Sequence, residues 1–272
     1  MKIALVSLNQ YWLDKERNYE QCQQYVAAAA DQHCELVIFP EMTLTGFAPG
    51  HPDVVEERLS SSTLEWFGEL SRMHQIPVLF GASLIEKRGE KPFNSICMSD
   101  SLGNVEQLYS KIHLFSYAQE EQFFEAGEAP GVAEISEIKM GLSICYDLRF
   151  PEIFSMQAEK CPVFINIASW PEPRIEHWYA LLKARAIENR AMMIGVNRVG
   201  FDGNQLNYPA SSRIFDPNGE QLKVEYSYQD LDIYSFELDQ LNKMREAFDV
   251  LKDKRFSLYA EVVNHVGRSG VT

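Results

Sequence analysis

Short runs of consecutive apolar residues are the feature of this chain that most restricts its fold. Strands exposed on one face alternate apolar and polar residues, whereas strands covered on both faces are apolar almost throughout. Runs of the second kind predict buried strands at Lys2–Leu8, Glu35–Pro40, Pro77–Ile85, Lys139–Cys145, Pro162–Ala168 and Ala191–Val199. Segments with helical character separate them, at Asn18–Gln32, Ser62–His74, Phe150–Glu159 and Pro173–Arg190. This alternation predicts a layered α/β fold in which helices cover at least one face of each sheet.

Less regular elements complete this plan, and nothing divides the chain. Further predicted strands are Phe93–Ser99, Val105–Lys111, Ser211–Asp216, Gln221–Glu225 and Asp232–Leu238, and the last predicted helix is Asp239–Phe248. No repeat or Gly/Pro-rich linker interrupts the sequence, so we expect one domain over residues 1–272 with its core at about 2–238. The segment 239–272 is too apolar after Lys252 to be a free tail, and we expect it to pack on the body or at an interface.

The charge of the chain excludes several classes of partner. Lysine and arginine total 25 and aspartate and glutamate total 39, which gives a net charge of −14. Such a surface repels nucleic acid and anionic lipid, so we expect neither as a partner. Because the global field also repels small anions, an anionic substrate would need a local positive group.

The same sequence contains no apolar run of the ~18 residues that a membrane span needs, and we expect no signal peptide. Its five cysteines are scattered and form no CxxC pair or zinc-like cluster. We therefore expect a cytoplasmic protein without a metal or cofactor, acting on a small molecule.

Three chemically reactive residues follow predicted buried strands. Glu41, Lys111 and Cys145 each lie at or just after the carboxyl end of such a strand. In open α/β sheets the ligand crevice forms at those ends, so the three side chains are expected to converge. Each taken alone has an ordinary explanation, as a surface glutamate, a solvated lysine or a small buried cysteine. Their number and placement favour a catalytic site.

Cys145 has the most informative surroundings of the three. It ends a predicted strand and is followed by a sharp turn and a predicted helix. A nucleophile on such an elbow is exposed above the sheet, close to backbone N–H groups that can hold an oxyanion. The other four cysteines lack this setting.

Three sequence blocks at these positions resemble the nitrilase superfamily of carbon–nitrogen hydrolases. They are Phe39-Pro40-Glu41 with Gly46-Phe47, Tyr109-Ser110-Lys111-Ile112-His113-Leu114-Phe115, and Ile144-Cys145-Tyr146-Asp147-Leu148-Arg149-Phe150-Pro151. The resemblance extends from Lys2 to about Leu238. It implies a four-layer α-β-β-α sandwich, a Glu41–Lys111–Cys145 triad and a tendency to form homodimers. It also implies a second glutamate seven residues before a glycine, for which Glu120 and Gly127 fit, with Glu121 as the alternative.

The chemistry implied by the resemblance is amide hydrolysis through a cysteine thioester. Lys111 and the helix after Cys145 are expected to lower the pKa of the thiol from its usual value of about 8.5. Glu41 would transfer protons, and Lys111 with the backbone N–H of Tyr146 would stabilise the oxyanion. Glu120 would orient Lys111 or the substrate. We expect His113 and His177 to be structural.

The residues around the triad also bear on the substrate. Cys145-Tyr146-Asp147 resembles the amidase branches, and the segment Ala168–Arg174 with His177-Trp178 resembles bacterial omega-amidases, which hydrolyse 2-oxoglutaramate and 2-oxosuccinamate. Arg174 is the candidate to bind the carboxylate of such a substrate, although pairing with Glu172 or Glu176 on the surface explains it equally well. Other candidate pocket residues are Phe47, Phe115, Tyr146 and Trp170, and Arg149 is expected to be structural and paired with Glu188.

Several other functions fit parts of the same evidence. One is a different aliphatic amidase or an N-carbamoyl amine hydrolase of the same superfamily. Another is a catalytically silent, ligand-binding relative, against which the intact triad argues. A redox thiol protein is a weaker alternative, because no second cysteine lies near Cys145 in the sequence.

Overall fold

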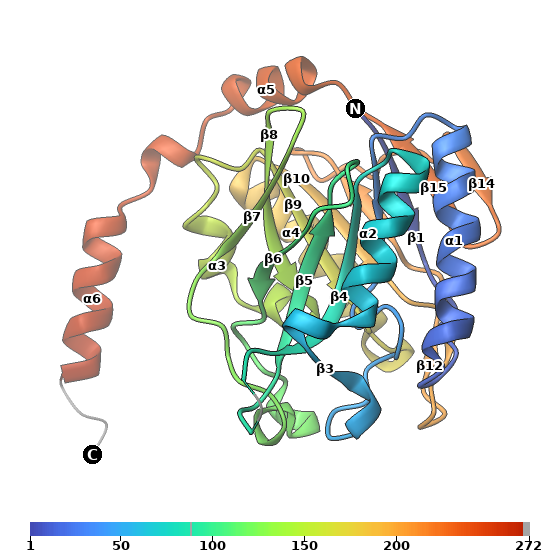
Figure 1. Cartoon of the computed structure of the whole chain (residues 1–272). Coiled ribbons are helices and arrows are strands. Elements are labelled where there is room, and N and C mark those ends of the chain that lie inside the picture. The colour runs from blue at the N-terminus through green and yellow to red at the C-terminus, as the bar shows by residue number, and fades with distance from the viewer. Residues whose placement is uncertain (88, 269–272) are drawn as a thin grey trace.

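A computed structural model describes residues 1–87 and 89–268 of the chain. Most of its strands form two sheets (Figure 1). The eight-stranded sheet has the order β14 (Tyr226–Tyr228), β15 (Leu231–Ser235), β1 (Lys2–Val6), β2 (Leu36–Ile38), β4 (Val78–Ile85), β5 (Phe93–Ser99) and β6 (Val105–Ser110), with β3 (Val55–Glu57) paired to β4. The five-stranded sheet has the order β13 (Arg213–Phe215), β10 (Met192–Asn197), β9 (Val163–Ala168), β8 (Ile138–Ile144) and β7 (Gly131–Ile135). Strands β11 (Gly200–Phe201) and β12 (Asn207–Tyr208) form a separate ribbon.

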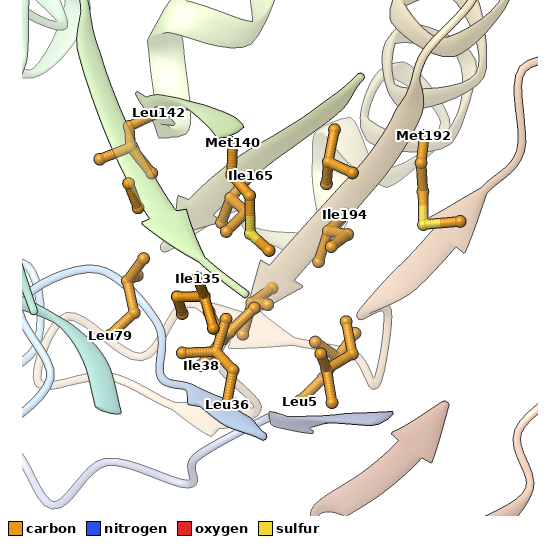
Figure 2. Close-up of a cluster of buried hydrophobic side chains, with 14 of the residues drawn as sticks. Leu5, Leu36, Ile38, Leu79, Ile135, Met140, Leu142, Ile165, Met192 and Ile194 are labelled. Carbon is orange, nitrogen blue, oxygen red and sulfur yellow. The ribbon is translucent and has the colours of Figure 1, made fainter. Parts of the chain in front are cut away.

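The two sheets face each other across a shared apolar core. Figure 2 shows side chains of both sheets meeting there, among them Leu36 and Ile38 from one sheet and Met140 and Ile165 from the other. Helices α1 (Lys15–Asp31) and α2 (Ser62–His74) pack against the outer face of the larger sheet. Helices α3 (Pro151–Ser155) and α4 (Ile175–Asn189) cover the outer face of the smaller one. The fold is the predicted α-β-β-α sandwich.

Burial on both faces explains why the central strands lack alternation. Every residue of β4, β9 and β10 is buried. The edge strand β7 shows the opposite pattern, with Val132 and Glu134 exposed between buried neighbours. Strand β7 was not predicted, because its short sequence alternates buried and exposed positions and lacks the continuous apolar run that marks the central strands.

Two elements are shorter in the structure than the sequence predicts, or begin at another residue. The helix expected at Phe150–Glu159 ends at Ser155 and continues as irregular turns. The strand expected at Gln221–Glu225 is reduced to one bridge between Gln221 and Phe215, and the regular strand begins at Tyr226. In the second case the Asn218-Gly219 turn forms as predicted, but the chain then crosses to the other sheet.

The C-terminal segment has two parts that behave differently. Arg245 of α5 (Leu238–Ala247) holds that helix on the body by donating to the carbonyls of Ala158 and Arg190, at 2.7 Å each. Helix α6 (Phe256–Arg268) stands away from both sheets (Figure 1), and Tyr259, Val262 and Val263 are about half exposed or more. Packing on the body continues beyond α5, because Leu251 is buried beside α3 and α4 and Lys254 Nζ donates to Ser155 Oγ at 2.8 Å and to Asn189 Oδ1 at 3.1 Å. The homo-oligomer stays a prediction.

The remaining short 3₁₀ segments lie mostly in the loops around the strand ends. They are Pro52–Val54, Arg58–Ser60, Ser116–Ala118, Glu120–Gln122, Cys145–Arg149, Glu172–Arg174 and Leu251–Asp253. Among the described residues, every helix is too short or too polar to cross a membrane.

The carboxyl ends of β2, β6, β8 and β9 meet at one end of the sandwich. Strands β2 and β4 are parallel, and β6 returns to the same direction because it pairs antiparallel to β5, which is antiparallel to β4. The turn after β2 lies against Gly81 of β4, where an added Cβ would approach the backbone N of Met42 to 2.4 Å and the backbone of Glu41 to 3.0 Å. A glycine at this position therefore lets the Glu41 turn lie close to the sheet.

We expect Gly81→Ala to destabilise the protein by about 1–3 kcal/mol, because the new methyl group displaces backbone rather than a flexible side chain. The displaced backbone carries Glu41, so the hydrolytic activity that the family resemblance predicts should also fall per folded molecule. Gly195→Ala is the matched control, since its methyl group meets the side chains of Leu182 and Trp178, away from Glu41. Urea unfolding and turnover of the folded fraction measure both effects. Equal activity in the two variants would contradict this account of Gly81.

Candidate active site

Lys111 lies between two buried glutamates. Its Nζ is 3.1 Å from Oε1 of Glu41 and 2.9 Å from Oε2 of Glu120. All three side chains are at most 1% exposed. Burial opposes the charged form of Lys111, but the charges of Glu120 and Glu41 outweigh it and raise the pKa of the ammonium above its ordinary value. Lys111 is therefore a fixed positive charge and not a proton acceptor.

The structure places Glu120, and not Glu121, beside Lys111. Glu120 also accepts a hydrogen bond from the backbone N of Phe115 at 2.6 Å, whereas Glu121 is exposed. The spacing to Gly127 has a physical basis. The backbone N of Gly127 donates to the Lys111 carbonyl at 2.8 Å, and an added Cβ there would lie only 2.1 Å from the Ser110 carbonyl. The glycine thus lets the loop carrying Glu120 return onto the strand end carrying Lys111.

Cys145 sits on a strained turn at the end of β8. Its backbone φ angle is +46°, in the left-handed region that residues other than glycine seldom adopt. The 3₁₀ turn Cys145–Arg149 begins at this residue. The half-buried thiol donates toward the carbonyl of Ser169, with Sγ and O 3.9 Å apart. The predicted strand–turn–helix arrangement is therefore present, because the 3₁₀ turn at Cys145–Arg149 leads into helix α3 at Pro151.

The expected lowering of the thiol pKa is wrong. Burial and the charge of Glu41 raise the pKa of Cys145 well above its ordinary value, and the opposing effect of Lys111 is smaller. The sequence indicated that Lys111 lies near the thiol. It did not indicate how far the Cys145 sulfur is shielded from water, or that two glutamate charges lie nearby. In the resting site the sulfur is a neutral thiol, so it needs a base.

Ser169 connects Glu41 to the second sheet. Its backbone N, just after β9, donates to Oε2 of Glu41 at 2.9 Å, and its carbonyl faces the Cys145 thiol. Asn197 at the end of β10 holds the next residue, because its side chain accepts from Trp170 N at 2.7 Å and donates to Trp170 O at 2.8 Å. One peptide segment therefore contacts both the candidate base and the candidate nucleophile.

Asp147 links the Cys145 turn to the Lys111 strand. It is fully buried and accepts from the Ile144 backbone N at 2.9 Å, from the Tyr109 hydroxyl at 2.8 Å and from the His113 backbone N at 2.9 Å. Tyr109 and His113 lie two residues before and after Lys111, so one carboxylate sets the position of both strand ends. In the sequence, Asp147 indicated only a branch of the family. Its position two residues after Cys145, at the end of a predicted buried strand, was the signal for a structural role.

The pocket above Cys145 has a volume of about 810 Å³. Its lining includes the five residues predicted to contact substrate, namely Phe47, Phe115, Tyr146, Trp170 and Arg174. Glu41, Lys111 and Cys145 lie at its base, and Glu120 stands behind Lys111 and away from the lining.

Two arginines also line this pocket. The guanidinium of Arg174 lies over the rings of Phe115 and Tyr117, 5.6 and 6.0 Å from their centroids. The predicted pairing of Arg149 with Glu188 is wrong. Glu188 binds Arg185 at 2.9 Å, whereas Arg149 lies over the Trp170 ring at 4.8 Å. In the described part of the chain, neither pocket arginine has a carboxylate within ion-pair distance, so the alternative pairing of Arg174 with Glu172 or Glu176 does not form.

His113 and His177 contact other side chains. The ring of His113 stacks on Phe150 with 3.7 Å between centroids and contacts Asp147, and His177 contacts Arg149 at 3.3 Å. Within residues 1–87 and 89–268, no group of three His, Cys, Asp or Glu side chains is placed to hold a metal ion.

The chain is similar in sequence and in structure to known proteins. The carbon-nitrogen hydrolase family model matches residues 2–244. The hydrolase in the agr operon of Staphylococcus aureus is 30% identical over 264 residues, which cover 95% of this chain and 100% of that protein. Omega-amidase YafV of Escherichia coli (strain K12) is 31% identical over 258 residues, with 93% and 96% covered.

The crystal structure of XC1258 from Xanthomonas campestris, a CN-hydrolase superfamily protein with an arsenic adduct in the active site, has a TM-score of 0.84. It is 27% identical in sequence, and the match covers 94% of this chain and 97% of that one. The chain therefore belongs to the carbon–nitrogen hydrolase family. As a member of that family, it is an enzyme that hydrolyses carbon–nitrogen bonds.

We expect Asp147→Asn to lower the turnover number at least about tenfold, because an amide N–H₂ in place of one carboxylate oxygen would face the donors of Ile144 and Tyr109. The loss should appear in turnover of the folded protein as well as in stability. Asp100→Asn is the matched control, since Asp100 caps the exposed turn before β6 by accepting from Leu102 and Asn104. Similar kinetics for both variants would contradict the linking role.

Proposed function

We propose that this enzyme hydrolyses the terminal amide of a short 2-oxo dicarboxylic acid monoamide, namely 2-oxoglutaramate or 2-oxosuccinamate. The observation that carries the proposal is Arg174, a pocket cation without a carboxylate partner among the described residues, facing the same cavity as Cys145. Such a guanidinium suits a substrate with a carboxylate at the end remote from its amide. The name of the omega-amidase relative supports the same substrate class.

The first half-reaction begins with a neutral thiol. Glu41 accepts the thiol proton as the Cys145 sulfur forms a bond to the amide carbon. The carbonyl oxygen becomes an oxyanion, stabilised by the Lys111 ammonium and the backbone N–H of Tyr146. Glu41 then returns the proton to nitrogen, the C–N bond breaks, and ammonia leaves behind a thioester.

The second half-reaction uses the same groups on water. Glu41 takes a proton from a water molecule whose oxygen attacks the thioester carbon. The second oxyanion occupies the same site beside Lys111. Its collapse breaks the C–S bond, the proton returns from Glu41 to sulfur, and the carboxylic acid product releases its own proton to solvent and leaves as a carboxylate. Glu120 contacts Lys111 and holds it in place throughout.

The burial of Lys111 strengthens the interaction of its positive charge with the oxyanion. A charge in a low-dielectric site stabilises a developing oxyanion more strongly than one in water. Because its two glutamates raise the pKa of Lys111, the ammonium keeps its proton over the working pH range. The thiol needs a base, and Lys111 cannot be that base because it keeps its proton. Glu41 is therefore the group that transfers protons.

A cytoplasmic location is part of the same proposal. All five cysteines are free thiols, which suits a reducing compartment. A homodimer is proposed as well, and the exposed apolar residues of α6 are the surface that supports it.

Cys145→Ala should reduce ammonia release from 2-oxoglutaramate at least about a thousandfold, because the variant lacks the sulfur that forms the thioester. Cys161→Ala is the matched control, because this buried thiol lies outside the pocket and should leave turnover largely unchanged. Ammonia release is measured by a coupled assay on folded protein. Undiminished turnover in Cys145→Ala would refute the mechanism. Inactivity of the wild type would refute the substrate and direct the search to neutral amides and N-carbamoyl amines.

Arg174→Ala should raise KM for 2-oxoglutaramate about 10- to 100-fold, the equivalent of one hydrogen-bonded charge interaction. KM for a neutral aliphatic amide should change little. Arg213→Ala is the control, since Arg213 stacks on Tyr179 at 3.7 Å and is not part of the pocket lining. An equal change in KM for charged and neutral substrates would show that Arg174 does not bind the carboxylate.

A further inference from the structure

Asn94 is a buried amide that contacts both glutamates of the site. It lies on β5, is fully buried, and its Nδ2 donates to Oε1 of Glu41 at 2.8 Å and to Oε1 of Glu120 at 3.0 Å. Its backbone carbonyl also accepts from the backbone N of Lys111 at 2.8 Å. One residue therefore contacts all three members of the charge cluster.

The orientation of this amide follows from its neighbours. An asparagine NH₂ group has two hydrogens, and here each is directed at a different carboxylate. The reverse orientation would set the amide oxygen against two negatively charged groups. The Oδ1 atom has no hydrogen-bond partner among the described residues. All the hydrogen bonding of this side chain is therefore directed at the two glutamates.

Two carboxylates around one ammonium repel each other, so each needs a fixed position. Lys111 and Asn94 both donate to Oε1 of Glu41, which leaves Oε2 to accept from the Ser169 backbone beside Cys145. Without the amide, the Glu41 carboxylate could rotate about its terminal side-chain torsion, because only Lys111 would still bind Oε1. The amide also separates Glu41 from Glu120, because it stands between them.

We propose that Asn94 is a positioning residue for hydrolysis, which fixes the orientation of the Glu41 carboxylate toward the thiol of Cys145. Asn94 is not part of the pocket lining, so it acts through Glu41 and does not touch substrate. This inference rests on the proposed role of Glu41 as the proton acceptor, but it does not depend on which amide is the substrate.

The test compares two Asn94 variants with a matched control. Asn94→Leu keeps nearly the same shape and removes both donors without adding charge, and Asn94→Ala removes the amide altogether. Asn166→Ala is the control, because Asn166 is an equally buried strand asparagine whose Oδ1 also lacks a partner in the described part of the chain, and whose Nδ2 binds Ser143 and no carboxylate. Urea unfolding identifies the folded fraction of each variant.

Two readouts are expected to move together. With 2-oxoglutaramate, the turnover number of both Asn94 variants should fall at least about tenfold while KM changes less than about twofold. The rate of alkylation of Cys145 by iodoacetamide, followed by intact mass, should fall in parallel, because the thiol loses its correctly oriented base. The other four cysteines are buried, so a single addition reports on Cys145.

The outcomes separate the inference from the substrate proposal. If the wild type does not hydrolyse 2-oxoglutaramate, the substrate is wrong, but the alkylation rates still test Asn94. If the Asn94 variants alkylate as fast as Asn166→Ala and the wild type, the positioning role is overturned. A rise in KM with an unchanged turnover number would overturn it as well, since that would place Asn94 in substrate binding.

Discussion

The burial of one ammonium between two carboxylates is the interaction on which the rest of the site depends. Removing charges from water is strongly unfavourable unless each is paired and fully hydrogen-bonded. Lys111 pairs with Glu41 and Glu120, and the oxygens of the two glutamates are further bonded by Asn94, Ser169 N and Phe115 N. Because these donors come from distant parts of the chain, the cluster forms only when both sheets are in place.

The sandwich architecture divides the chemistry between its two sheets. The candidate base and the cation follow strands of the larger sheet, whereas Cys145 and Ser169 follow strands of the smaller one. The apolar core between the sheets therefore sets the distance between base and nucleophile (Figure 2). Asp147 reinforces this relation locally, because it binds the Cys145 turn and the residues flanking Lys111.

The pocket contains cationic side chains although the chain as a whole is acidic. A chain with a net charge of −14 presents two arginines without carboxylate partners among the described residues, in the same cavity as a buried, negatively charged cluster. An amide-bearing anion would thus be oriented with its carboxylate toward Arg174 and its amide toward Cys145. The Phe115 ring beneath the Arg174 guanidinium favours this orientation of the substrate, since a cation–π contact stabilises the cation and leaves its charge free to bind a carboxylate.

The sequence by itself determined a layered α/β plan, its central strands and the three strand-end residues, because runs of apolar residues and the turn residues between them are local properties. The family resemblance added the four-layer sandwich and Glu120, with Glu121 as the alternative. Tertiary structure alone decided the direction of the thiol pKa, the partners of Arg149 and the roles of Asn94 and Asp147. Each of these depends on which groups from distant segments lie within a few ångströms and on how much water is excluded there. Neither quantity is encoded by spacing along the chain.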